Sequence, residues 1–306
     1  MDVAILAGGA GRRLRPLTYW TPKPLFPVPG GTLLDRLLHQ IEPLRPRTVY
    51  VVVRHLADKL IAHLAGARPV HVLQQGKPYT LLGALATVEQ AAQGPILILH
   101  GDNCFSALPV EAIKSAPSSS ATFFVETVPD DTASAATLAA TGCYVLNREA
   151  LQTAATIQDA DNLAVLTHAI LASGDHLHAR PLDAWRYNIN SVQEYLSLQD
   201  RVWEDPDGHL LPSSSNGGNT VWVSGSATVE HAVLGPRVTL APGACVRHSY
   251  LSDTVILAGA TVENTRLHRA VVGPGPTGCT VLMFGGKDEC ASNHAEAPGE
   301  RRGAAE

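Results

Sequence analysis

The chain has 306 residues, of which 45% are hydrophobic, and a formal net charge of −5 at pH 7. This length exceeds a typical single domain and allows a sizeable core, so we expect two domains. The slightly acidic balance gives no general attraction to nucleic acids or to anionic membranes, and neither is expected as a partner.

The first predicted element is a strand that ends in glycines. Val3–Leu6 is a short apolar run typical of a buried strand in a parallel sheet. Gly8, Gly9 and Gly11 follow, and a backbone without Cβ atoms can turn with positive φ and bring its N–H groups close to phosphate oxygens. An ordinary strand-to-helix turn can carry the same glycines, so they leave both interpretations open.

Cationic side chains follow this loop. Arg12, Arg13, Arg15 and Lys23 supply the donors that a bound triphosphate and a departing pyrophosphate would need. The run has neither the Gly-Lys-Ser/Thr of a P-loop nor the G-x-G-x-x-G of dinucleotide-binding folds. It therefore predicts phosphate chemistry on a nucleotide.

Predicted strands and helices alternate through residue 200. The strands are Val3–Leu6, Thr48–Val53, Val70–Leu73, Pro95–Leu99, Thr122–Val125 and Gly142–Leu146, and the helices are Thr32–Glu42, Ala57–Leu64, Thr80–Ala92 and Leu163–Ser173. This alternation predicts an α/β fold with a doubly wound, mostly parallel sheet and a site at the C-terminal ends of its strands.

One of these strand ends carries a carboxylate. The strand Pro95–Leu99 runs into Gly101-Asp102-Asn103. A carboxylate at the C-terminal end of a central strand suits a hard cation that bridges phosphates. An isolated Gly-Asp is also common in plain turns, so position alone does not assign it.

The segment from Leu6 to Val28 resembles the signature of the sugar-1-phosphate nucleotidyltransferases, which make nucleotide sugars. The resemblance implies that Arg13 is catalytic and that Lys23 contacts the phosphates. It assigns nucleotide binding to Leu6, Ala7, Gly8, Gly9, Gly11, Gln75, Pro78 and Leu81. Thr80 replaces the family's glycine in the base-reading stretch, which leaves the choice of nucleotide open.

Resemblance also implies a Mg²⁺ site. The Gly-Asp-Asn is similar to that of the thymidylyltransferase branch, in which the aspartate, here Asp102, binds the metal. Trp185–Leu196 resembles the family's Trp-x-Asp-Ile-Gly-Thr-Pro-Glu-Asp-Tyr, with Asn188 at the second ligand. An amide oxygen coordinates Mg²⁺ without a charge, so we expect weaker metal affinity. Gly142 is assigned to the substrate site.

The largest departure from the family lies between Phe123 and Tyr144. The chain has no Glu-Lys-Pro motif there, the motif that binds the sugar phosphate in the family, and we expect its hairpin to be deleted and Glu126 to be an ordinary strand residue. Either the acceptor is unusual, for example a cyclitol phosphate or a modified sugar of secondary metabolism, or catalysis has been lost.

From about residue 221 the pattern changes. Aliphatic residues recur every five or six positions, namely Val223, Val229, Leu234, Leu240, Val246, Leu251, Ile256, Val262, Leu267 and Val272. This resembles the hexapeptide repeat of a short left-handed parallel β-helix; an antiparallel sheet would instead alternate with period two. We expect a nucleotidyltransferase domain at 1–202, a linker at 203–220, the β-helix at 221–284 and a disordered tail at 285–306.

The resulting hypothesis is a Mg²⁺-dependent enzyme, expected to be a homo-oligomer, that joins a nucleoside triphosphate to a sugar or cyclitol 1-phosphate. The alternative is a regulatory subunit that binds nucleotide or nucleotide sugar without turnover. A third reading, a β-helix acyltransferase using His231 or His248, would need acyl-CoA. Five dispersed cysteines predict neither disulfides nor zinc, and the absence of a spanning run or signal peptide predicts a cytoplasmic protein.

Overall fold

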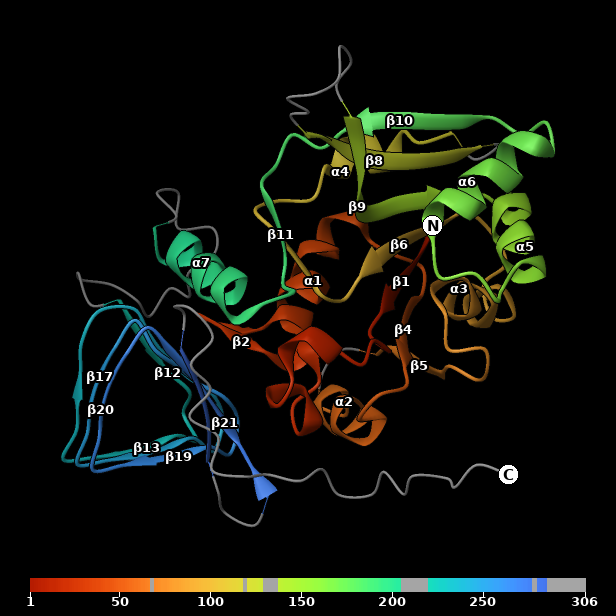
Figure 1. Ribbon diagram of the computed structural model, residues 1–306. Helices are drawn as coiled ribbons and strands as arrows, with labels where there is room; N and C mark the ends of the chain where they lie inside the picture. The colour runs from red at the N-terminus through yellow and green to blue at the C-terminus, as the bar shows by residue number, and fades with distance from the viewer. Residues whose placement is uncertain (67–68, 118–119, 129–136, 205–219, 277–279, 285–306) are drawn as a thin grey trace, which may run out of the picture. The chain divides into compact units, whose positions relative to one another are not determined.

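The computed structural model describes the chain except for residues 67–68, 118–119, 129–136, 205–219, 277–279 and 285–306 (Figure 1). The chain divides into two compact units whose segments interleave. The first comprises Met1–Ala10, Lys23–Leu25 and Leu33–Asn188, and the second comprises Gly11–Pro22, Phe26–Thr32 and Ile189–Glu306. The predicted boundary at residue 202 is not a border between these units. The predicted tail and residues 205–219 of the predicted linker lie outside the described residues.

The first unit is built on a seven-stranded sheet in the order β10-β8-β9-β6-β1-β4-β5. Its strands are β1 (Asp2–Leu6), β4 (Val49–Val53), β5 (His71–Gln74), β6 (Ile96–His100), β8 (Ala121–Val128), β9 (Thr137–Leu146) and β10 (Leu177–Pro181). β9 runs antiparallel to both β6 and β8, and the other neighbours are parallel. The predicted mostly parallel α/β sheet is therefore confirmed.

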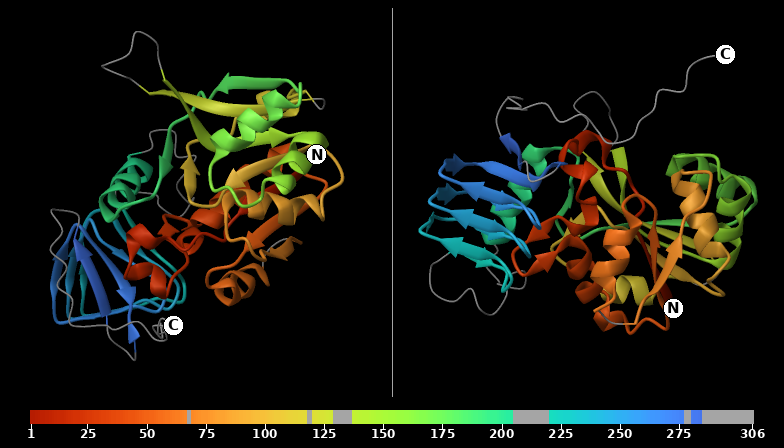
Figure 2. Two further views of the ribbon diagram at one scale, coloured as in Figure 1. Left: turned by 45° about the vertical axis from the view of Figure 1, so that its right-hand side comes forward. Right: turned by 90° about the horizontal axis from the view of Figure 1, so that it is seen from below.

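Helices cover both faces of this sheet (Figure 2). They are α1 (Leu33–Gln40), α2 (Ala57–Leu64), α3 (Leu81–Glu89), α4 (Val110–Lys114), α5 (Arg148–Thr156) and α6 (Leu163–Ala172). Side chains alternate along a strand, so Val3 and Ile5 of β1 pack with α1, α2 and α4, while Ala4 packs with α3, α5 and α6. The β1 end that carries the glycine loop is thus fixed between two apolar layers.

The expected deletion of the hairpin is wrong. β8 and β9 pair antiparallel out to Val128 and Thr137, beyond a register shift between Phe123 and Val125. The threonine- and alanine-rich stretch after residue 136 continues the strand, because a paired strand tolerates these residues when its backbone bonds are satisfied. The hairpin arms are therefore present without the family's Glu-Lys-Pro motif.

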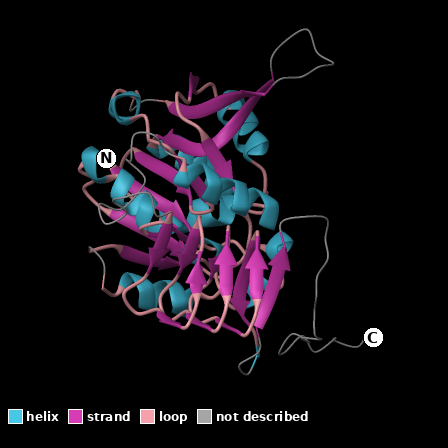
Figure 3. Cartoon of the chain, turned by 90° about the vertical axis from the view of Figure 1, so that its left-hand side faces the viewer, coloured by secondary structure: helices cyan, strands magenta, loops and turns pink. Residues whose placement is uncertain are grey.

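Three stacks of short strands in the second unit make the sides of a triangle (Figure 1), and Figure 3 shows the strands of one stack side by side. Their neighbours are parallel except for β22, which pairs antiparallel with β21. The strands are β12 (Val221–Val223), β13 (Thr228–Glu230), β14 (Val233–Leu234), β15 (Val238–Leu240), β16 (Cys245–Arg247), β17 (Tyr250–Ser252), β18 (Val255–Ile256), β19 (Thr261–Glu263), β20 (Arg266–His268), β21 (Ala270–Pro274) and β22 (Thr280–Phe284). Val221 pairs with Val238, and Val255 with Val271, so the chain advances 17 and later 16 residues per coil. This arrangement is consistent with a β-helix.

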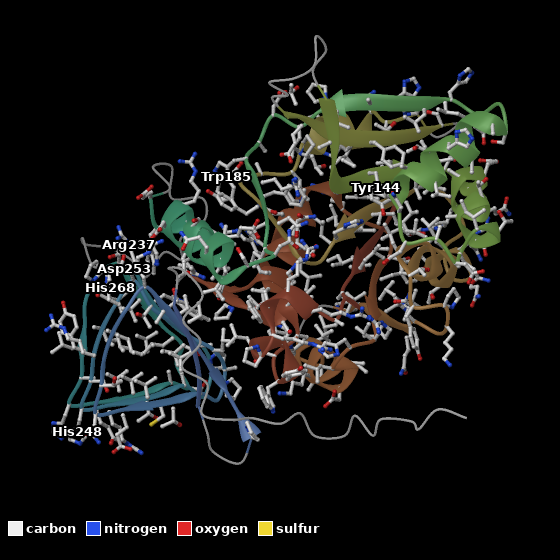
Figure 4. All side chains as sticks on the ribbon, viewed as in Figure 1. Tyr144, Trp185, Arg237, His248, Asp253 and His268 are labelled. Atoms are coloured by element: carbon white, nitrogen blue, oxygen red, sulfur yellow. The ribbon has the colours of Figure 1, made fainter. Side chains whose placement is uncertain are left out.

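The corners of the coils are formed by residues with left-handed backbone conformations. One column consists of His231, His248 and Asn264, and a second of Arg237, Asp253 and Arg269, with φ between 45° and 54° throughout. Figure 4 shows Arg237, Asp253 and His268 together at one corner and His248 at another. Each corner therefore repeats its geometry while its side chains differ.

Helix α7 (Val192–Trp203) is bound to the coils by charge and by hydrogen bonds. Asp200 contacts Arg237 at 3.3 Å and Arg269 at 3.2 Å. Gln199 accepts a hydrogen bond of 3.1 Å from Thr239 of β15 and donates one of 2.7 Å to the Pro27 carbonyl. Pro27 begins β2 (Pro27–Val28), which pairs with β3 (Gly31–Thr32), so this short hairpin is held by α7.

The signature loop at residues 11–22 also belongs to this second unit. It contains η1 (Arg12–Leu14) and η2 (Leu17–Tyr19), and η3 (Lys23–Leu25) follows in the first unit. Leu17 is fully buried, and a Cβ on Gly273 of β21 would lie 2.8 Å from its Cδ2. Thr18 Oγ1 donates to the Gly11 carbonyl at 2.9 Å. The loop is thus packed directly against the last coil.

Leu17→Ala should lower the free energy of unfolding by about 2 to 4 kcal/mol, because it leaves a cavity where the loop packs against β21. Urea unfolding followed by circular dichroism measures this change. Leu171→Ala is the control, since that leucine is 58% exposed and its loss should cost little. Equal effects of the two substitutions would show that the loop is not anchored through Leu17.

A pH-dependent contact joins α1 and α2. His63 Nε2 lies 2.7 Å from Asp35 Oδ1, and this hydrogen bond raises the pKa of His63, with burial opposing it and the Asp35 charge adding to it. A raised folded-state pKa means that the stabilisation is complete below the unfolded pKa of about 6.5 and is lost as pH rises through the folded value. The difference in unfolding free energy between wild type and His63→Gln should therefore be larger, by about 0.5 kcal/mol, at about pH 5.5 than at about pH 8.5. A difference that does not change with pH would contradict this.

None of the described helices combines the length and the apolar character needed to cross a bilayer.

Candidate active site

The centre of the candidate site is an ion pair between two predicted residues. Lys23 in η3 places its Nζ 2.8 Å from Oδ2 of Asp102, which follows β6. Gly101, the residue before Asp102, contacts the end of β1. Its N–H donates to the Leu6 carbonyl at 2.9 Å, and a Cβ added to Gly101 would lie 2.9 Å from the same oxygen. A side chain at Gly101 would push Asp102 away from the strand ends. The structure therefore brings Lys23 and Asp102 together, 79 residues apart in the chain.

Neighbouring charges set the protonation of this pair. Burial by itself would raise the pKa of Asp102, but the Lys23 ammonium and the nearby His100 lower it below the usual value. His100, the last residue of β6, has a pKa lowered by burial and by the charges of Arg186 and Lys23, against the opposing pull of Asp102. At neutral pH the site thus holds an aspartate anion beside a neutral imidazole.

The glycine loop closes against the ends of β4 and β5. A Cβ on Gly8 would lie 3.1 Å from Gln75 Oε1 and 3.2 Å from the Arg54 Cβ, so the backbone approaches these residues closely. Ala7 N–H donates to the Val52 carbonyl at 2.8 Å, which fixes the end of β1 before the turn. A Cβ on Gly9 would meet nothing within 4 Å. The backbone at Gly9 therefore borders open space.

Gln75 is the anchor of the predicted base-reading stretch. It is buried, and its Nε2 donates to the carbonyls of Pro78 at 3.3 Å and Thr80 at 2.8 Å. Thr80, the departure from the family glycine, is the N-cap of α3 and accepts from the Gly83 N–H at 2.9 Å. The Leu81 N–H donates to Asp161 at 2.7 Å. These bonds hold the stretch over residues 75–81 in one conformation.

The residues predicted from the sequence do not include Arg54, which lies beside this stretch, or Tyr79, which lies within it. The Arg54 guanidinium lies 4.9 Å from the centre of the Tyr79 ring, and the ring is 54% exposed. Arg54 follows β4 directly, so its position at a C-terminal strand end was a usable signal. Tyr79 lies inside the base-reading stretch, between two residues that were assigned to it.

Of the two predicted metal residues, Asp102 directly precedes β7 (Asn103–Phe105) and Asn188 ends the neighbouring strand, β11 (Arg186–Asn188). β11 pairs antiparallel with β7, and Asn188 stands opposite Asn103, the residue after Asp102. Asn103 is buried and donates to the Thr141 carbonyl at 3.1 Å. Among the described residues, no group of three His, Cys, Asp or Glu side chains gathers in one place. A cation here would therefore depend on one carboxylate, amide oxygens, water and phosphate.

Gly142 lies close to the side chains of Asn103 and His100. Its φ is 74°, and an added Cβ would lie 2.3 Å from Asn103 Nδ2 and 3.0 Å from Cγ of His100. Glycine is needed both for the backbone conformation and for the approach of these side chains. The assigned substrate residue thus lies against the residues that flank Asp102.

Arg186 connects this group to the hairpin arm. Its Nη1 donates to Asn103 Oδ1 at 3.1 Å, and its Nη2 forms an ion pair with Glu126 of β8. Glu126 is a strand residue of β8, as expected, and it is also the counter-ion of this arginine. Sequence reasoning missed Arg186, although a residue two places before Asn188 on a strand shares its face.

Gly11 and Arg13 belong to the second unit. Gly11 has φ 57° and an added Cβ would lie 2.7 Å from Thr18 Cγ2, while Arg13 is exposed in η1. Their part in phosphate binding stays a prediction. The suggested acyl-transfer bases His231 and His248 stack at one corner of the coils, with ring centres 5.1 Å apart and planes at 11°.

Residues 3–136 match the family model described as nucleotidyl transferase. These residues hold the glycine loop, Lys23 and Asp102, whose arrangement is described above. The matched residues make up less than half of the chain, and the match supports its likeness to the sugar-1-phosphate nucleotidyltransferases. Individual relatives show how much of the chain is shared.

Among curated proteins, the bifunctional protein GlmU of Methanocaldococcus jannaschii is 30% identical over 105 residues, which cover 34% of this chain and 26% of GlmU. The chain thus spans about a quarter of the length of the first curated relatives that it matches. The UTP–glucose-1-phosphate uridylyltransferase AglF of Haloferax volcanii is 25% identical over 237 residues, covering 67% of this chain and 98% of AglF.

Two solved structures are similar to this chain in fold. A Bacillus anthracis protein described as a glucose-1-phosphate thymidylyltransferase aligns with a TM-score of 0.54 at 19% identity, covering 65% of this chain and 93% of that one. A UDP-glucose pyrophosphorylase from Acinetobacter aligns with a TM-score of 0.53 at 15% identity, covering 67% and 94%. At these identities the likeness shows the α/β fold.

Proposed function

We propose that this protein transfers a nucleotidyl group from a nucleoside triphosphate to a sugar 1-phosphate or a sugar-like cyclitol 1-phosphate. An oxygen of the acceptor phosphate forms a bond to the α-phosphorus, and the bond from that phosphorus to pyrophosphate breaks. The observation that carries the proposal is the Lys23–Asp102 pair at the strand ends that also present the glycine loop. Positioned charge and close approach are the main requirements of phosphoryl-type transfer.

Each residue has a role in this proposal. The backbone from Leu6 to Gly9 would line the phosphates, and the stretch held by Gln75 would contact the base. Lys23 would neutralise charge on the phosphates. Arg13 would stabilise the departing pyrophosphate, a role that rests on the resemblance of its loop to the family signature. Gly142 would leave room for the acceptor.

The residues present fit a Mg²⁺ ion. Asp102 is ionised, its side chain is 33% exposed, and Asn188, whose side chain carries an amide oxygen, stands on the strand that pairs with β7. Oxygen ligands of this kind suit a hard cation, which would neutralise charge on the bound phosphates. Because the Lys23 ammonium lies on Asp102 and Asn188 carries no charge, weak metal affinity is expected.

Further parts of the proposal concern the whole chain. We propose that the stacked coils form a short left-handed β-helix that supports a homo-oligomer, and that the enzyme acts in the cytoplasm, in secondary metabolism. The domain division at residues 202 and 221 remains part of this proposal. The missing Glu-Lys-Pro motif and Asn188 favour the second candidate, a regulatory subunit that binds nucleotide without turnover.

The test is pyrophosphate release by the purified protein with Mg²⁺, each common nucleoside triphosphate and a panel of sugar and cyclitol 1-phosphates. Release that requires one nucleotide and one acceptor supports the enzyme. Lys23→Met serves as the inactive control. Absence of release with every pair, together with a nucleotide-dependent rise in melting temperature, would overturn turnover and favour the regulatory subunit.

A further inference from the structure

An arginine with spare donors lies beside the Lys23–Asp102 pair. The Arg186 side chain is 14% exposed, and its guanidinium bonds to Asn103 and Glu126. Its Nε is buried and, among the described residues, donates no hydrogen bond. A buried N–H without an acceptor is costly, so this edge of the guanidinium is suited to an acceptor that is not part of the chain.

Arg186 faces the same region as the assigned metal residues. It lies two positions before Asn188 in β11, and residues two apart on a strand share a face. Asn188 stands opposite Asn103, which follows Asp102. The charges of Asp102, Arg186 and Lys23 all act on the same imidazole, that of His100. The three charges are therefore close enough to influence one side chain.

The charges of this region cancel in pairs. Lys23 is paired with Asp102, and Arg186 with Glu126. Asn103 is fully buried and fixes one edge of the guanidinium, whereas the Glu126 side chain is 34% exposed and comes from the hairpin arm β8. Glu126 is thus the more replaceable of the two partners of Arg186.

A phosphate group matches the edge that Glu126 occupies. Arginine presents its Nε and Nη2 donors in parallel, and a phosphate can accept both, while Glu126 is bonded to Nη2 alone. A dianionic phosphate would also satisfy the buried Nε. Displacing Glu126 costs little, because its carboxylate is already about a third exposed and regains solvent.

We propose that Arg186 binds the phosphate of the acceptor substrate and that Glu126 is its resting counter-ion, displaced when the acceptor enters. The proposal rests on the proposed function and adds the residue that recognises the acceptor phosphate in a chain without the Glu-Lys-Pro motif. The alternative is a purely structural pair that ties β11 to the hairpin.

Steady-state kinetics separates these readings. Arg186→Gln should raise the KM for the acceptor about 10- to 100-fold, the loss expected for a charge-assisted pair of hydrogen bonds, and leave the KM for the nucleotide within about twofold. Glu126→Gln frees the guanidinium and should lower the acceptor KM. Arg180→Gln is the matched control, since Arg180 of β10 bonds only to Ala112 and Ser115 in the described structure.

A structural pair would behave differently. Both Arg186→Gln and Glu126→Gln would then lower stability and affect both substrates alike, and opposite shifts in acceptor KM would not occur. Arg186→Lys adds a second readout, because it keeps the charge but loses the two parallel donors and should restore the acceptor KM only in part. Unchanged acceptor KM in Arg186→Gln would overturn the proposal.

Calorimetric titration with glucose 1-phosphate and with inorganic phosphate tests binding without turnover. Wild type and Arg180→Gln should bind alike, and Arg186→Gln should bind at least about tenfold more weakly. Equal binding by the wild type and the two variants, or no binding of either probe by the wild type, would contradict the proposed role of Arg186 in phosphate binding. If the wild type releases no pyrophosphate with any pair of nucleotide and acceptor, the proposed function is contradicted. The titration would then still test whether Arg186 binds phosphate.

Discussion

Asp102→Asn is expected to lower turnover by about a thousandfold, because it removes a fixed charge at the point where phosphate charge must be balanced. The substitution keeps the shape of the side chain. Lys23, with only 9% of its side chain exposed, loses its counter-ion, and the free energy of unfolding should fall by about 1 to 3 kcal/mol. Pyrophosphate release and urea unfolding measure the two effects separately.

Asp2→Asn is the matched control for this substitution. Asp2 is fully buried and is bonded to Arg47 through both carboxylate oxygens, at 3.0 and 2.6 Å, at the opposite end of β1. Its loss should reduce stability by a similar amount and leave turnover almost unchanged. The double variant Lys23→Met, Asp102→Asn should recover stability without recovering turnover. Near-normal activity in Asp102→Asn would show that the site is misplaced.

Gly142→Ala is expected to reduce the free energy of unfolding by about 2 to 4 kcal/mol. The residue has φ 74°, and the new Cβ would lie 2.3 Å from Asn103 Nδ2. Asn103 must move, and with it the guanidinium of Arg186 that it holds. The acceptor KM should therefore rise together with the loss of stability.

Gly174→Ala is the control that separates backbone strain from steric collision as causes of the lost stability. Gly174 has φ 84°, but nothing lies within 4 Å of its added Cβ, so its substitution carries the cost of the left-handed backbone without the collision. This control should lose about 1 kcal/mol and keep normal kinetics. Equal losses in the two variants would mean that Asn103 and His100 do not enclose Gly142.

Prediction from the sequence worked best where a motif directly follows a strand that the sequence also predicts. Val3–Leu6 and Pro95–Leu99 are apolar runs that end in glycine and in Gly-Asp, and neighbouring parallel strands bring those ends together. Lys23 and Asp102 were assigned separately, Lys23 to the phosphates and Asp102 to the metal, so their direct ion pair at 2.8 Å was not part of the prediction.

Other features depend on pairing across long distances in the chain. Glu126 and Arg186 are 60 residues apart, and Glu126 stands outside the motif-like segment that contains Arg186, so no local pattern links them. The hairpin was missed because a stretch of small residues was taken as the absence of a strand, although pairing with β8 stabilises it. Local propensity is weaker than such pairing in strands.

The interleaved units were also beyond local reasoning. The aliphatic repeat predicted stacked strands after residue 221, and buried Leu240, Ile256 and Val272 form that stack. Nothing in the repeat indicates that residues 11–22 pack against its last coil through Leu17 and Gly273. That contact depends on one glycine that leaves space for one leucine side chain.

The most direct test of the proposed reaction follows the oxygens of the acceptor phosphate. With the best nucleotide and acceptor pair, the phosphate of the acceptor is labelled with ¹⁸O and the products are examined by ³¹P NMR. Attack by the acceptor phosphate on the α-phosphorus predicts label in the diphosphate of the nucleotide sugar and unlabelled pyrophosphate. Labelled pyrophosphate, or release of pyrophosphate with no labelled diphosphate product, would contradict the account.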